Sequence, residues 1–562
     1  MDFKKEVIKI LQPHLDKVDE TLIEIPPDPN LGDYAYPCFI LAKQYKNNPT
    51  EISKQLQKKI KPTKAIAKIQ ATGPYLNFFI NKSILTKQTI TNILKQKHKY
   101  GSNIKGKNKT LVIDFSAPNI AKPFSIGHLR STVIGNSLIQ IHKFSGYKTV
   151  GINYLGDWGT QFGKLIYAFN QWGDRKKLKK DPIKHLLKLY VKFHHDAELN
   201  PDLEDKGKEW FSKLEKGNKK ARNLWKEFTD LSLIEFNKIY DLMDIKFDSY
   251  AGESFYENKM PAMIKLIKNK GITEESEGAL IVPLEDKKMP PCLILKSDGS
   301  TIYATRDLTA AKHRYDKYKF DKMLYVTDFR QQLHFNQFFA VLDKMSYKWS
   351  KKCEHIGFGL VKMPGGVVLS TRKGNVVFME EVLGKSIKLV KKIIQEKNPK
   401  LKDKDKVAEM VGIGAIIFWD LSNDWTHDLT FDWDNILNFE GETAPYVQYA
   451  HARAAAILRK AGKLDYKVKY EKLTHEKEIA LVRLLSDFPL QVEDALDKHK
   501  PSVIARYTLD LAHVFNDFYS CCPCLNEKDK DIQKARLLLV MITKQTLANG
   551  LSLLGIKAPD QM

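Results

Sequence analysis

The 562-residue sequence contains few cysteines and no long apolar run. Six cysteines cannot cross-link a chain of this length, so the disulfide framework typical of small secreted proteins is excluded and a reducing cytoplasm is indicated. The longest uninterrupted apolar stretch, Met410 to Trp419, has ten residues, whereas a membrane-spanning helix needs about 18 or more. The N-terminal segment also lacks the apolar core of a signal peptide. We therefore expect a cytoplasmic protein with no membrane partner.

Several common ligand-binding motifs are absent or incomplete. The chain has neither the glycine pattern of dinucleotide-binding folds nor that of a phosphate-binding P-loop. Cys521, Cys522 and Cys524 include a CxxC spacing, but a structural zinc needs four ligands and no second pair lies nearby. We expect no structural metal, and the role of these three cysteines stays open.

Negative charge is scarce relative to positive charge. Lys and Arg total 91 against 67 Asp and Glu, which gives a net charge of +24. Residues 41–104 carry 13 lysines and one acid, a net charge of +12, whereas residues 1–40 carry four lysines and eight acids. An excess of this size favours a polyanionic partner, because each neutralised phosphate releases counterions. A solvated, lysine-rich surface remains the alternative on charge alone.

The order of the expected elements indicates several domains. A chain of this length holds about three or four, at roughly 100–200 residues each. Residues 1–104 have the pattern of an α/β module. A β-branched run at 110–117, a helical pattern at 127–144 and a strand-like run at 148–155 form a βαβ unit, which predicts a parallel sheet. Residues 165–250 and the region beyond about 405 are mainly helical. The expected C-terminal helices cover 407–421, 445–462, 476–498, 501–519 and 531–554.

The segment between the first strand and helix of this unit carries the residues of a phosphate site. Backbone N–H groups and the dipole of a helix N-terminus favour anions. Gly127 would let a nucleotide approach the backbone, His128 could donate to phosphate oxygens, and Lys122 adds a positive charge nearby. Taken alone, a histidine in this position is more often a satisfied surface histidine.

The motifs in and beyond this segment resemble those of a known family. SIGH at 125–128 resembles the HIGH signature of class I aminoacyl-tRNA synthetases, and SAPNIAKPFSIGHLRSTVIGN as a whole resembles its arginyl-tRNA synthetase version. VLSTRKGN at 368–375 resembles the second class I signature, KMSKS, in a degenerate form. Further blocks similar to that family are NYLGDWGTQFGKL, SYAGESFY, IYATRDLTAAKHR, PYVQYAHARA and LSLLGIKAPDQM. The resemblance to arginyl-tRNA synthetases therefore runs along nearly the whole chain.

The resemblance implies an α/β fold class with three domains. An N-terminal α/β appended domain that recognises the tRNA D-loop would cover 1–104. A Rossmann-like parallel-sheet catalytic domain, with a helical insertion and the KMSKS-like loop, would cover 105–435. An all-α helical bundle that binds the anticodon would cover 436–562.

The resemblance also implies a reaction. An arginine–tRNA ligase activates L-arginine with ATP, as its Mg²⁺ complex, to arginyl-adenylate and pyrophosphate. It then transfers arginine to the 3′-terminal adenosine of tRNA(Arg). A monomer is the expected form. A class I synthetase for another amino acid and a non-catalytic tRNA-binding paralogue stay open as alternatives. Isoacceptor preference, and whether activation requires bound tRNA, also stay open.

The two signatures supply the residues expected to act on ATP. Positioning and charge stabilisation dominate attack at phosphorus. By resemblance, His128 would stabilise the triphosphate, and Arg372 and Lys373 would neutralise the leaving pyrophosphate. The expected ATP-binding residues are Ser125, Gly127, His128, Ser370, Thr371 and Lys373, and the expected catalytic residues are His128, Lys122, Lys373 and Arg372.

Two positions depart from the class I signatures. Ser125 replaces the first histidine of HIGH and can donate a hydrogen bond but cannot carry charge. Thr371 replaces the lysine at the fourth position of KMSKS. Within this family a lysine just upstream of the HIGH block often substitutes for that missing lysine. We therefore expect Lys122 to supply its charge.

The resemblance implies five arginine-binding positions. A guanidinium presents a planar fork of donors that carboxylates accept in bidentate geometry. Fixed acceptors also help to reject lysine, whose point charge would leave them unpaired. Glu253 and Asp307 are expected to engage the guanidinium, Asn119 and Gln331 the α-amino and α-carboxylate groups, and Tyr303 belongs to the same set.

The resemblance also implies residues that contact tRNA. Tyr75 and Asn77 occupy the D-loop-contacting positions, and an aromatic ring beside an amide suits a single-stranded base. A core tyrosine on a strand is the alternative for Tyr75. Tyr449 and Arg453, which lie on one helical face, and Tyr519 are candidates for the anticodon. Tyr449 could equally belong to the bundle core.

Overall fold

The computed structural model describes residues 3–363, 367–368, 377–438 and 441–562. The chain divides into two compact units, and each unit is assembled from three separate segments. The small unit consists of Met1–Tyr100, Arg453–Phe488 and Leu511–Thr546. The large unit consists of Gly101–Ala452, Pro489–Asp510 and Leu547–Met562.

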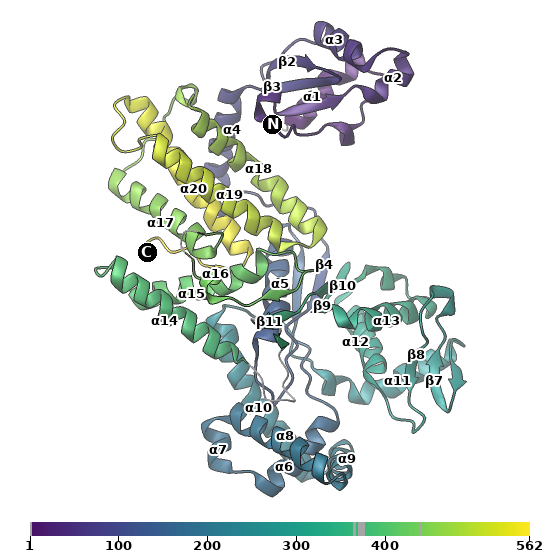
Figure 1. Ribbon diagram of the computed structural model, residues 1–562. Helices are drawn as coiled ribbons and strands as arrows, with labels where there is room; N and C mark the ends of the chain where they lie inside the picture. Colours follow the sequence, from purple (N-terminus) through teal and green to yellow (C-terminus); the bar gives the residue numbers. More distant parts are fainter. Residues whose placement is uncertain (1–2, 364–366, 369–376, 439–440) are drawn as a thin grey trace. The chain divides into compact units, whose positions relative to one another are not determined.

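A four-stranded parallel sheet is the centre of the large unit. Its strand order is β10-β9-β4-β5, and every neighbouring pair is parallel. Figure 1 labels three of these strands, β4, β9 and β10. The four strands are β4 (Thr110–Asp114), β5 (Lys148–Ile152), β9 (Lys322–Asp328) and β10 (Cys353–Phe358). Helix α5 (Ile126–Phe144) joins β4 to β5, which confirms the βαβ unit predicted from the sequence. The chain therefore leaves β4 toward one side of the sheet and later returns on the other side.

The ladder between β4 and β9 ends just before the chain turns into α5. Asp114 is the last β4 residue that pairs with β9, opposite Tyr325. Beyond it, the backbone N–H of Ser116 donates to the Ser131 hydroxyl (2.8 Å), and this hydroxyl donates to the carbonyl of Val326 (2.6 Å). A buried side chain of α5 thus replaces the missing ladder bond, and the two strand ends separate above it. In α/β sheets, ligands bind in such a crevice.

The long connection from β5 to β9 contains a helical segment and a small antiparallel sheet. The helices, which match the prediction for 165–250, are α6 (Thr160–Trp172), α7 (Arg175–Lys180), α8 (Pro182–Leu199), α9 (Asp202–Glu215) and α10 (Lys219–Leu242). Asp174, Asp181 and Asn218 begin α7, α8 and α10, because their side chains accept backbone N–H groups of the first turn. The remaining elements are α11 (Met260–Asn269), β6 (Glu274–Ser276), β7 (Ala279–Val282), β8 (Cys292–Leu295) and α12 (Tyr303–Tyr318).

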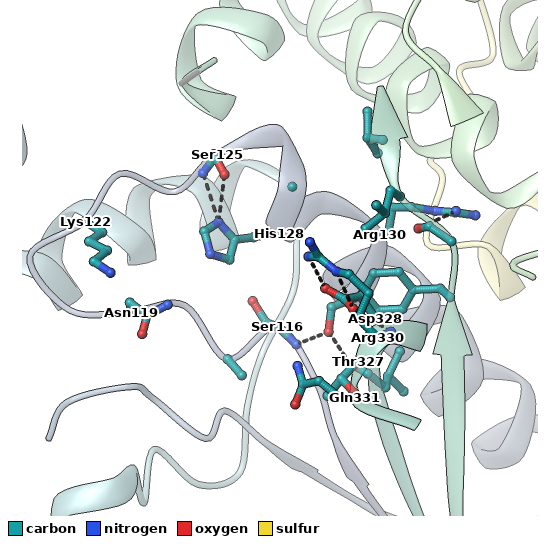
Figure 2. Close-up of a pocket in the computed structure, with 18 residues that line it drawn as sticks. Ser116, Asn119, Lys122, Ser125, His128, Arg130, Thr327, Asp328, Arg330 and Gln331 are labelled. Atoms are coloured by element: carbon teal, nitrogen blue, oxygen red, sulfur yellow. Dashed lines mark hydrogen bonds and ion pairs between the residues drawn. The ribbon is translucent and has the colours of Figure 1, made fainter. Parts of the chain in front are cut away.

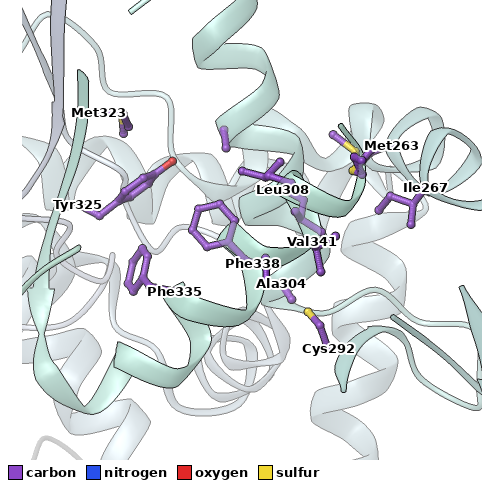
Figure 3. Close-up of a cluster of buried hydrophobic side chains, with 14 of the residues drawn as sticks. Met263, Ile267, Cys292, Ala304, Leu308, Met323, Tyr325, Phe335, Phe338 and Val341 are labelled. Carbon is purple, nitrogen blue, oxygen red and sulfur yellow. The ribbon is translucent and has the colours of Figure 1, made fainter. Parts of the chain in front are cut away.

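One apolar cluster fixes α12 against the central sheet (Figure 3). Leu308 of α12 is buried with Met323 of β9 and Phe338 of α13 (Gln332–Lys344), and Cys292 of β8 belongs to the same cluster. Burial of side chains of this size contributes about 1.5–3 kcal/mol each. The cluster holds the first turn of α12 near the carboxyl end of β9, which matters for the site described below.

The next elements of the large unit precede and follow residues 369–376, which lie outside the described residues. Strand β11 (Val361–Met363) pairs with β12 (Val367–Val368) and with β13 (Leu429–Thr430). Helix α14 (Met379–Lys397) packs on α15 (Lys404–Leu421) through a second apolar cluster. Helix α16 spans Trp433–Ile436.

The N-terminal part of the small unit is an α/β module. Its antiparallel sheet has the order β1-β3-β2, with β1 (Tyr34–Pro37), β2 (Ile66–Thr72) and β3 (Tyr75–Ile80). Its helices are α1 (Phe3–Leu11), α2 (Phe39–Tyr45), α3 (Pro49–Lys59) and α4 (Lys82–Gln96). Asp33 forms an ion pair of 2.8 Å with Arg483, so the module is joined to a C-terminal helical segment of the same unit.

Helices dominate the C-terminal part of the chain, as the sequence pattern predicts. They are α17 (Ala444–Ala461), α18 (Glu476–Lys498), α19 (Pro501–Cys521) and α20 (Lys530–Leu553). Over the part of the chain that the structure describes, no helix combines the length and the apolar character that crossing a membrane requires.

Helix α5 approaches the loop after β4 closely at Gly135. A methyl group at Gly135 would overlap the Phe115 side chain, whereas a methyl group at Gly384, in the interior of α14, would meet no neighbouring atom. Gly135→Ala should lower the free energy of unfolding by about 1–3 kcal/mol through overpacking. Gly384→Ala should leave it unchanged or raise it by up to about 1 kcal/mol. Chemical denaturation of both variants measures the difference, and equal stabilities would contradict the close approach.

Candidate functional site

A pocket of about 570 Å³ opens at the carboxyl edge of the parallel sheet (Figure 2). Its walls come from three stretches that lie far apart in the sequence. They are the loop after β4 together with the first turns of α5, the end of β9 with the turn that follows, and the end of β10 with the start of β11. The segment between the first strand and helix, for which the sequence predicts a ligand site, lines this pocket.

The loop after β4 has an unusual backbone. Ser116, Ala117 and Ala121 adopt the left-handed region, with φ of 72°, 46° and 61°. Residues other than glycine rarely adopt this backbone conformation, which costs about 1–3 kcal/mol per residue. Strain of this kind persists where the surrounding structure holds it, and it clusters at ligand sites. Here it turns the loop back across the start of α5 and forms one wall of the pocket.

Ser125 and His128 cap the N-terminus of α5. The backbone N–H of Ser125 donates to Nδ1 of His128 (3.1 Å), and the Ser125 hydroxyl lies 3.2 Å from the same nitrogen. Burial, together with the nearby Lys122 charge, lowers the pKa of His128 to about 4. His128 is therefore neutral near pH 7, with its proton on Nε2, because Nδ1 accepts a hydrogen bond. The ring can donate one hydrogen bond to an anion without carrying charge.

Gly127 forms the exposed lip of the same turn. A Cβ built there would contact only the Ser125 hydroxyl oxygen, at 3.4 Å. The protein itself therefore leaves space for a side chain, and the absence of one keeps the backbone open to the pocket that Gly127 lines.

Lys122 lies on the opposite side of the pocket mouth from the sheet. Its ammonium is 5.2 Å from the centre of the Tyr190 ring of α8, a cation–π distance. The charge of Lys122 is near enough to depress the pKa of His128. Lys122 and His128 thus face one pocket, as the sequence analysis expected of a phosphate site (Figure 2).

Asn119 and Gln331 both line this pocket, from the loop after β4 and the turn after β9. The backbone of residues 118–120 bonds to Gly156, with Gly156 N–H donating to the Pro118 carbonyl and Ile120 N–H to the Gly156 carbonyl, both at 3.1 Å. A side chain at position 156 would collide with Asn119. The two amides expected to bind the α-amino and α-carboxylate groups are therefore brought together.

Glu253, Asp307 and Tyr303 gather outside the lining of the pocket, next to the ends of β5 and β9. Glu253 lies close to the chain that leaves β5, because its backbone N–H donates to the Leu155 carbonyl (3.0 Å). Burial, with the charge of Asp307 acting in the same direction and that of Arg306 against it, raises the pKa of Glu253 to about 7. Asp307 lies 2.7 Å from Nε2 of His334, and Tyr303 packs edge-on against the same imidazole. The two carboxylates expected to bind a guanidinium are thus electrostatic neighbours.

Arg130 is a central residue of the site that the sequence analysis missed. It is 1% exposed, and its Nε donates to Asp420 of α15 (3.0 Å). Its Nη1 donates to the carbonyls of Gly359 (2.8 Å) and His427 (2.6 Å). Arg130 therefore fixes the end of β10, where the chain enters β11, to the first turns of α5. Only the position of an arginine just after SIGHL could have signalled this role.

Arg330 is a second cation that the sequence analysis missed. Its guanidinium forms a bidentate pair with Asp328, with Nε–Oδ1 and Nη2–Oδ2 distances of 3.1 and 2.6 Å. Both residues line the pocket (Figure 2). Their position directly after a predicted strand is a signal that the sequence contained.

Residues 370–373 of the KMSKS-like segment lie outside the described residues. The predictions for Ser370, Thr371, Arg372 and Lys373 therefore stay predictions. The chain that follows them bonds to the HIGH-like segment, with Ile126 N–H donating to the Val377 carbonyl (3.1 Å) and Met379 N–H to the Phe124 carbonyl (2.9 Å).

The residues expected to contact the D-loop differ in exposure. Tyr75 begins β3 and is half-buried, with the largely exposed Phe39 ring edge-on at 5.5 Å. Asn77 is 3% exposed, and its amide donates to the Thr72 hydroxyl (3.2 Å). Tyr75 can therefore offer its ring as it stands, whereas Asn77 would reach a base only after local rearrangement.

The residues expected to contact the anticodon are accessible. Tyr449 and Tyr519 are 44% and 41% exposed, so Tyr449 is not a core residue. Arg453 donates to Asn516 (2.6 Å) and lies 5.5 Å from the Tyr519 ring centre. Arg453 and Tyr519 therefore form one surface feature.

The C-terminal cysteines are ordinary thiols. Cys522 and Cys524 are buried and Cys521 is exposed. Burial raises the pKa of Cys522 to about 11 and that of Cys524 to about 12, which disfavours the thiolate that metals bind. Within the described ranges, no three histidine, cysteine or acidic side chains form a group that could hold a metal ion.

Comparison with family models agrees with this geometry. Residues 89–433 match the model described as "tRNA synthetases class I (R), catalytic domain". The fold is accordingly that of a class I aminoacyl-tRNA synthetase. Residues 2–80 match "Arginyl tRNA synthetase N terminal domain", and residues 447–562 match "DALR anticodon binding domain". The chain belongs to the arginyl-tRNA synthetase family, which confirms the resemblance found in the sequence.

Individual relatives cover the full chain. The arginine–tRNA ligases of Clostridium botulinum (strain Loch Maree / Type A3) and Clostridioides difficile (strain 630) are 49% and 48% identical to it, over 100% of both chains. The solved arginyl-tRNA synthetases of Thermus thermophilus and Plasmodium falciparum superpose with TM-scores of 0.82 and 0.80, over 100% of this chain and 99% of theirs. Their sequence identities are 24% and 25%. The predicted fold class is confirmed.

Proposed function

We propose that this chain is an arginine–tRNA ligase that works through the pocket at the carboxyl edge of its parallel sheet. It activates L-arginine with ATP to arginyl-adenylate and pyrophosphate, and it transfers arginine to the 3′-terminal adenosine of tRNA(Arg). The observation that carries the proposal is the neutral, Ser125-capped His128 at the start of α5, which faces Lys122 across one pocket.

ATP, as its Mg²⁺ complex, binds with its triphosphate at the N-terminus of α5. Free N–H groups and the dipole of this 19-residue helix favour the phosphates. Nε2–H of His128 donates to a phosphate oxygen, and it stabilises the charge that develops as the carboxylate of arginine attacks the α-phosphorus. The open backbone at Gly127 allows the nucleoside to pack closely.

Lys122 supplies the positive charge that Thr371 cannot supply. It does so from the strained loop after β4, while Arg372 and Lys373 neutralise the leaving pyrophosphate and Ser370 and Thr371 bind ATP. Support for this role comes from the shared pocket and from the effect of the Lys122 charge on the His128 pKa.

Arginine binds between the pocket and the acidic pair. Asn119 and Gln331 hold its α-amino and α-carboxylate groups inside the pocket, and Glu253 and Asp307 accept the guanidinium with Tyr303 beside them. Buried carboxylates that lack a fitting donor are costly, so an ammonium that fails to satisfy them is rejected.

Transfer RNA binds through both ends of the chain. Tyr75, with Asn77 after local rearrangement, contacts the D-loop, and the +12 segment 41–104 contacts phosphates. Tyr449, Arg453 and Tyr519 contact the anticodon. The D-loop-recognition, catalytic and anticodon-binding domains cover 1–104, 105–435 and 436–562. The enzyme acts as a cytoplasmic monomer.

A charging assay with twenty separate amino acids and total tRNA tests the activity. Arginine alone should be esterified, and pyrophosphate exchange with tRNA present should depend on arginine. Charging of a different amino acid would identify a synthetase of another specificity. Intact tRNA binding without any charging would identify a non-catalytic paralogue.

Replacing Lys122 tests its catalytic role. Lys122→Ala should slow adenylate formation by roughly 100- to 1000-fold, the usual loss when one group that stabilises a transition state is removed. Binding of tRNA should be retained. Lys192→Ala is a matched control. Lys192 belongs to α8, and its ammonium also lies over an aromatic ring, 4.4 Å from the centre of the Trp172 ring. Wild-type kinetics in the Lys122 variant would rule the role out.

The pH dependence of arginine binding tests Glu253. Its pKa is raised to about 7, so the carboxylate becomes protonated as the pH falls through neutrality and can no longer attract a guanidinium. The dissociation constant of L-arginine should rise up to about tenfold per pH unit below that value. Glu253→Gln should weaken binding and flatten this profile, as measured by calorimetry. A profile that is unchanged in the variant would exclude Glu253 as the titrating group.

A further inference from the structure

Arg306 lies among the residues expected to bind arginine, yet nothing has assigned it a role. It lies in the first turn of α12 and directly precedes Asp307 in the sequence. Its Nη1 lies 3.4 Å from Oε1 of Glu253. The Arg306 and Glu253 side chains are 12% and 23% exposed. The chain therefore presents a guanidinium of its own to the carboxylate proposed to bind the guanidinium of the substrate.

The surroundings of Arg306 are acidic. Besides Glu253, its charge lowers the pKa values of Asp157, Glu215 and Glu257 against the raising effect of their burial. Four carboxylates thus share one buried guanidinium as a source of countercharge. Arg222 is a second cation in this region, and it pairs with Glu257 at 3.4 Å.

The contact between Arg306 and Glu253 is loose. A charge-assisted guanidinium–carboxylate hydrogen bond is about 2.7–2.9 Å long and commonly bidentate. The observed pair has one contact of 3.4 Å, and among the described residues the buried Nε–H of Arg306 has no hydrogen-bond partner. A guanidinium held this way retains unsatisfied donors, so little is lost when another guanidinium takes its place.

Resting on the proposed arginine site, we infer that Arg306 is an internal stand-in for the substrate side chain. With no arginine bound, its guanidinium neutralises Glu253. When L-arginine enters, the substrate guanidinium takes Glu253, and Arg306 moves toward the neighbouring carboxylates Asp157, Glu215 and Glu257. No bond is made or broken in this exchange.

The exchange has a consequence for affinity. A site that is open only part of the time binds its ligand more weakly, by the fraction of molecules that are open. Arg306 therefore sets the affinity for free arginine below the value that Glu253 and Asp307 would give alone. It is a specificity-determining residue, because only a ligand that satisfies Glu253 better than Arg306 displaces it.

Calorimetric titration of the full-length protein with L-arginine tests this inference. The titration is made at about pH 8.5 and repeated at about pH 9.5, because the pKa of Glu253 is about 7 beside Arg306 and rises when the Arg306 charge is removed. Arg306→Ala and Arg306→Gln should both bind L-arginine at least about fivefold more tightly than the wild type, because the competitor is gone. The Michaelis constant for ATP should stay unchanged. Weaker arginine binding would instead show that Arg306 positions Glu253, and it would overturn the inference.

Two further variants separate this effect from others. Arg222→Ala removes the same charge from the same acidic region without touching Glu253, so it should change arginine affinity less than twofold or so. If the Arg222 and Arg306 variants bound L-arginine more tightly to the same extent, the effect would come from the overall positive charge near the site. That result would overturn the inference. Glu253→Gln tests the site itself. If it leaves arginine binding unchanged, the proposed arginine site is wrong. If it weakens binding while the Arg306 variants do not tighten it, only the inference fails.

Discussion

The separation of β4 from β9 just beyond Asp114 is the constraint on which the site depends. Parallel strands need long crossovers, and here one crossover leaves β4 toward β5 while the chain returns to β9 on the other side. The strand ends must part, and buried backbone groups must still be satisfied. The Ser131 hydroxyl meets both needs, since it joins the Ser116 N–H to the Val326 carbonyl. The pocket, the strained loop and the cap of α5 all lie around this single bridge.

The features of the fold that local pattern determines could be predicted from the sequence. The strand at Thr110–Asp114 and helix α5 follow from a β-branched run and from helical periodicity. The C-terminal helices were predicted to within a few residues for the same reason. The left-handed backbone at Ser116 and Ala117 was not predictable, because those residue types disfavour it and only tertiary contacts hold them there.

The candidate site was predictable where its residues are neighbours in the sequence. It was not predictable where residues from distant parts of the sequence meet. Ser125 and His128 lie within one helical turn, so their spacing already placed them together. The pairing of Arg130 with Asp420 joins residues 290 positions apart, and no periodicity encodes such a pair. The pairing of Arg306 with Glu253 has the same character, because the two residues lie 53 positions apart and meet only in the folded chain.

The acidic region shows why a site for a cation must manage its charge while it is empty. A buried carboxylate without a partner is costly, and it lowers that cost by taking up a proton or by pairing with a cation of the protein. Glu253 shows both responses, because burial raises its pKa to about 7 while Arg306 opposes that rise. An incoming arginine must therefore compete with a proton and with a guanidinium at once. A lysine ammonium, which cannot match the planar fork, competes less well against a guanidinium already in place. The internal arginine thus strengthens selection as well as stabilising the empty site.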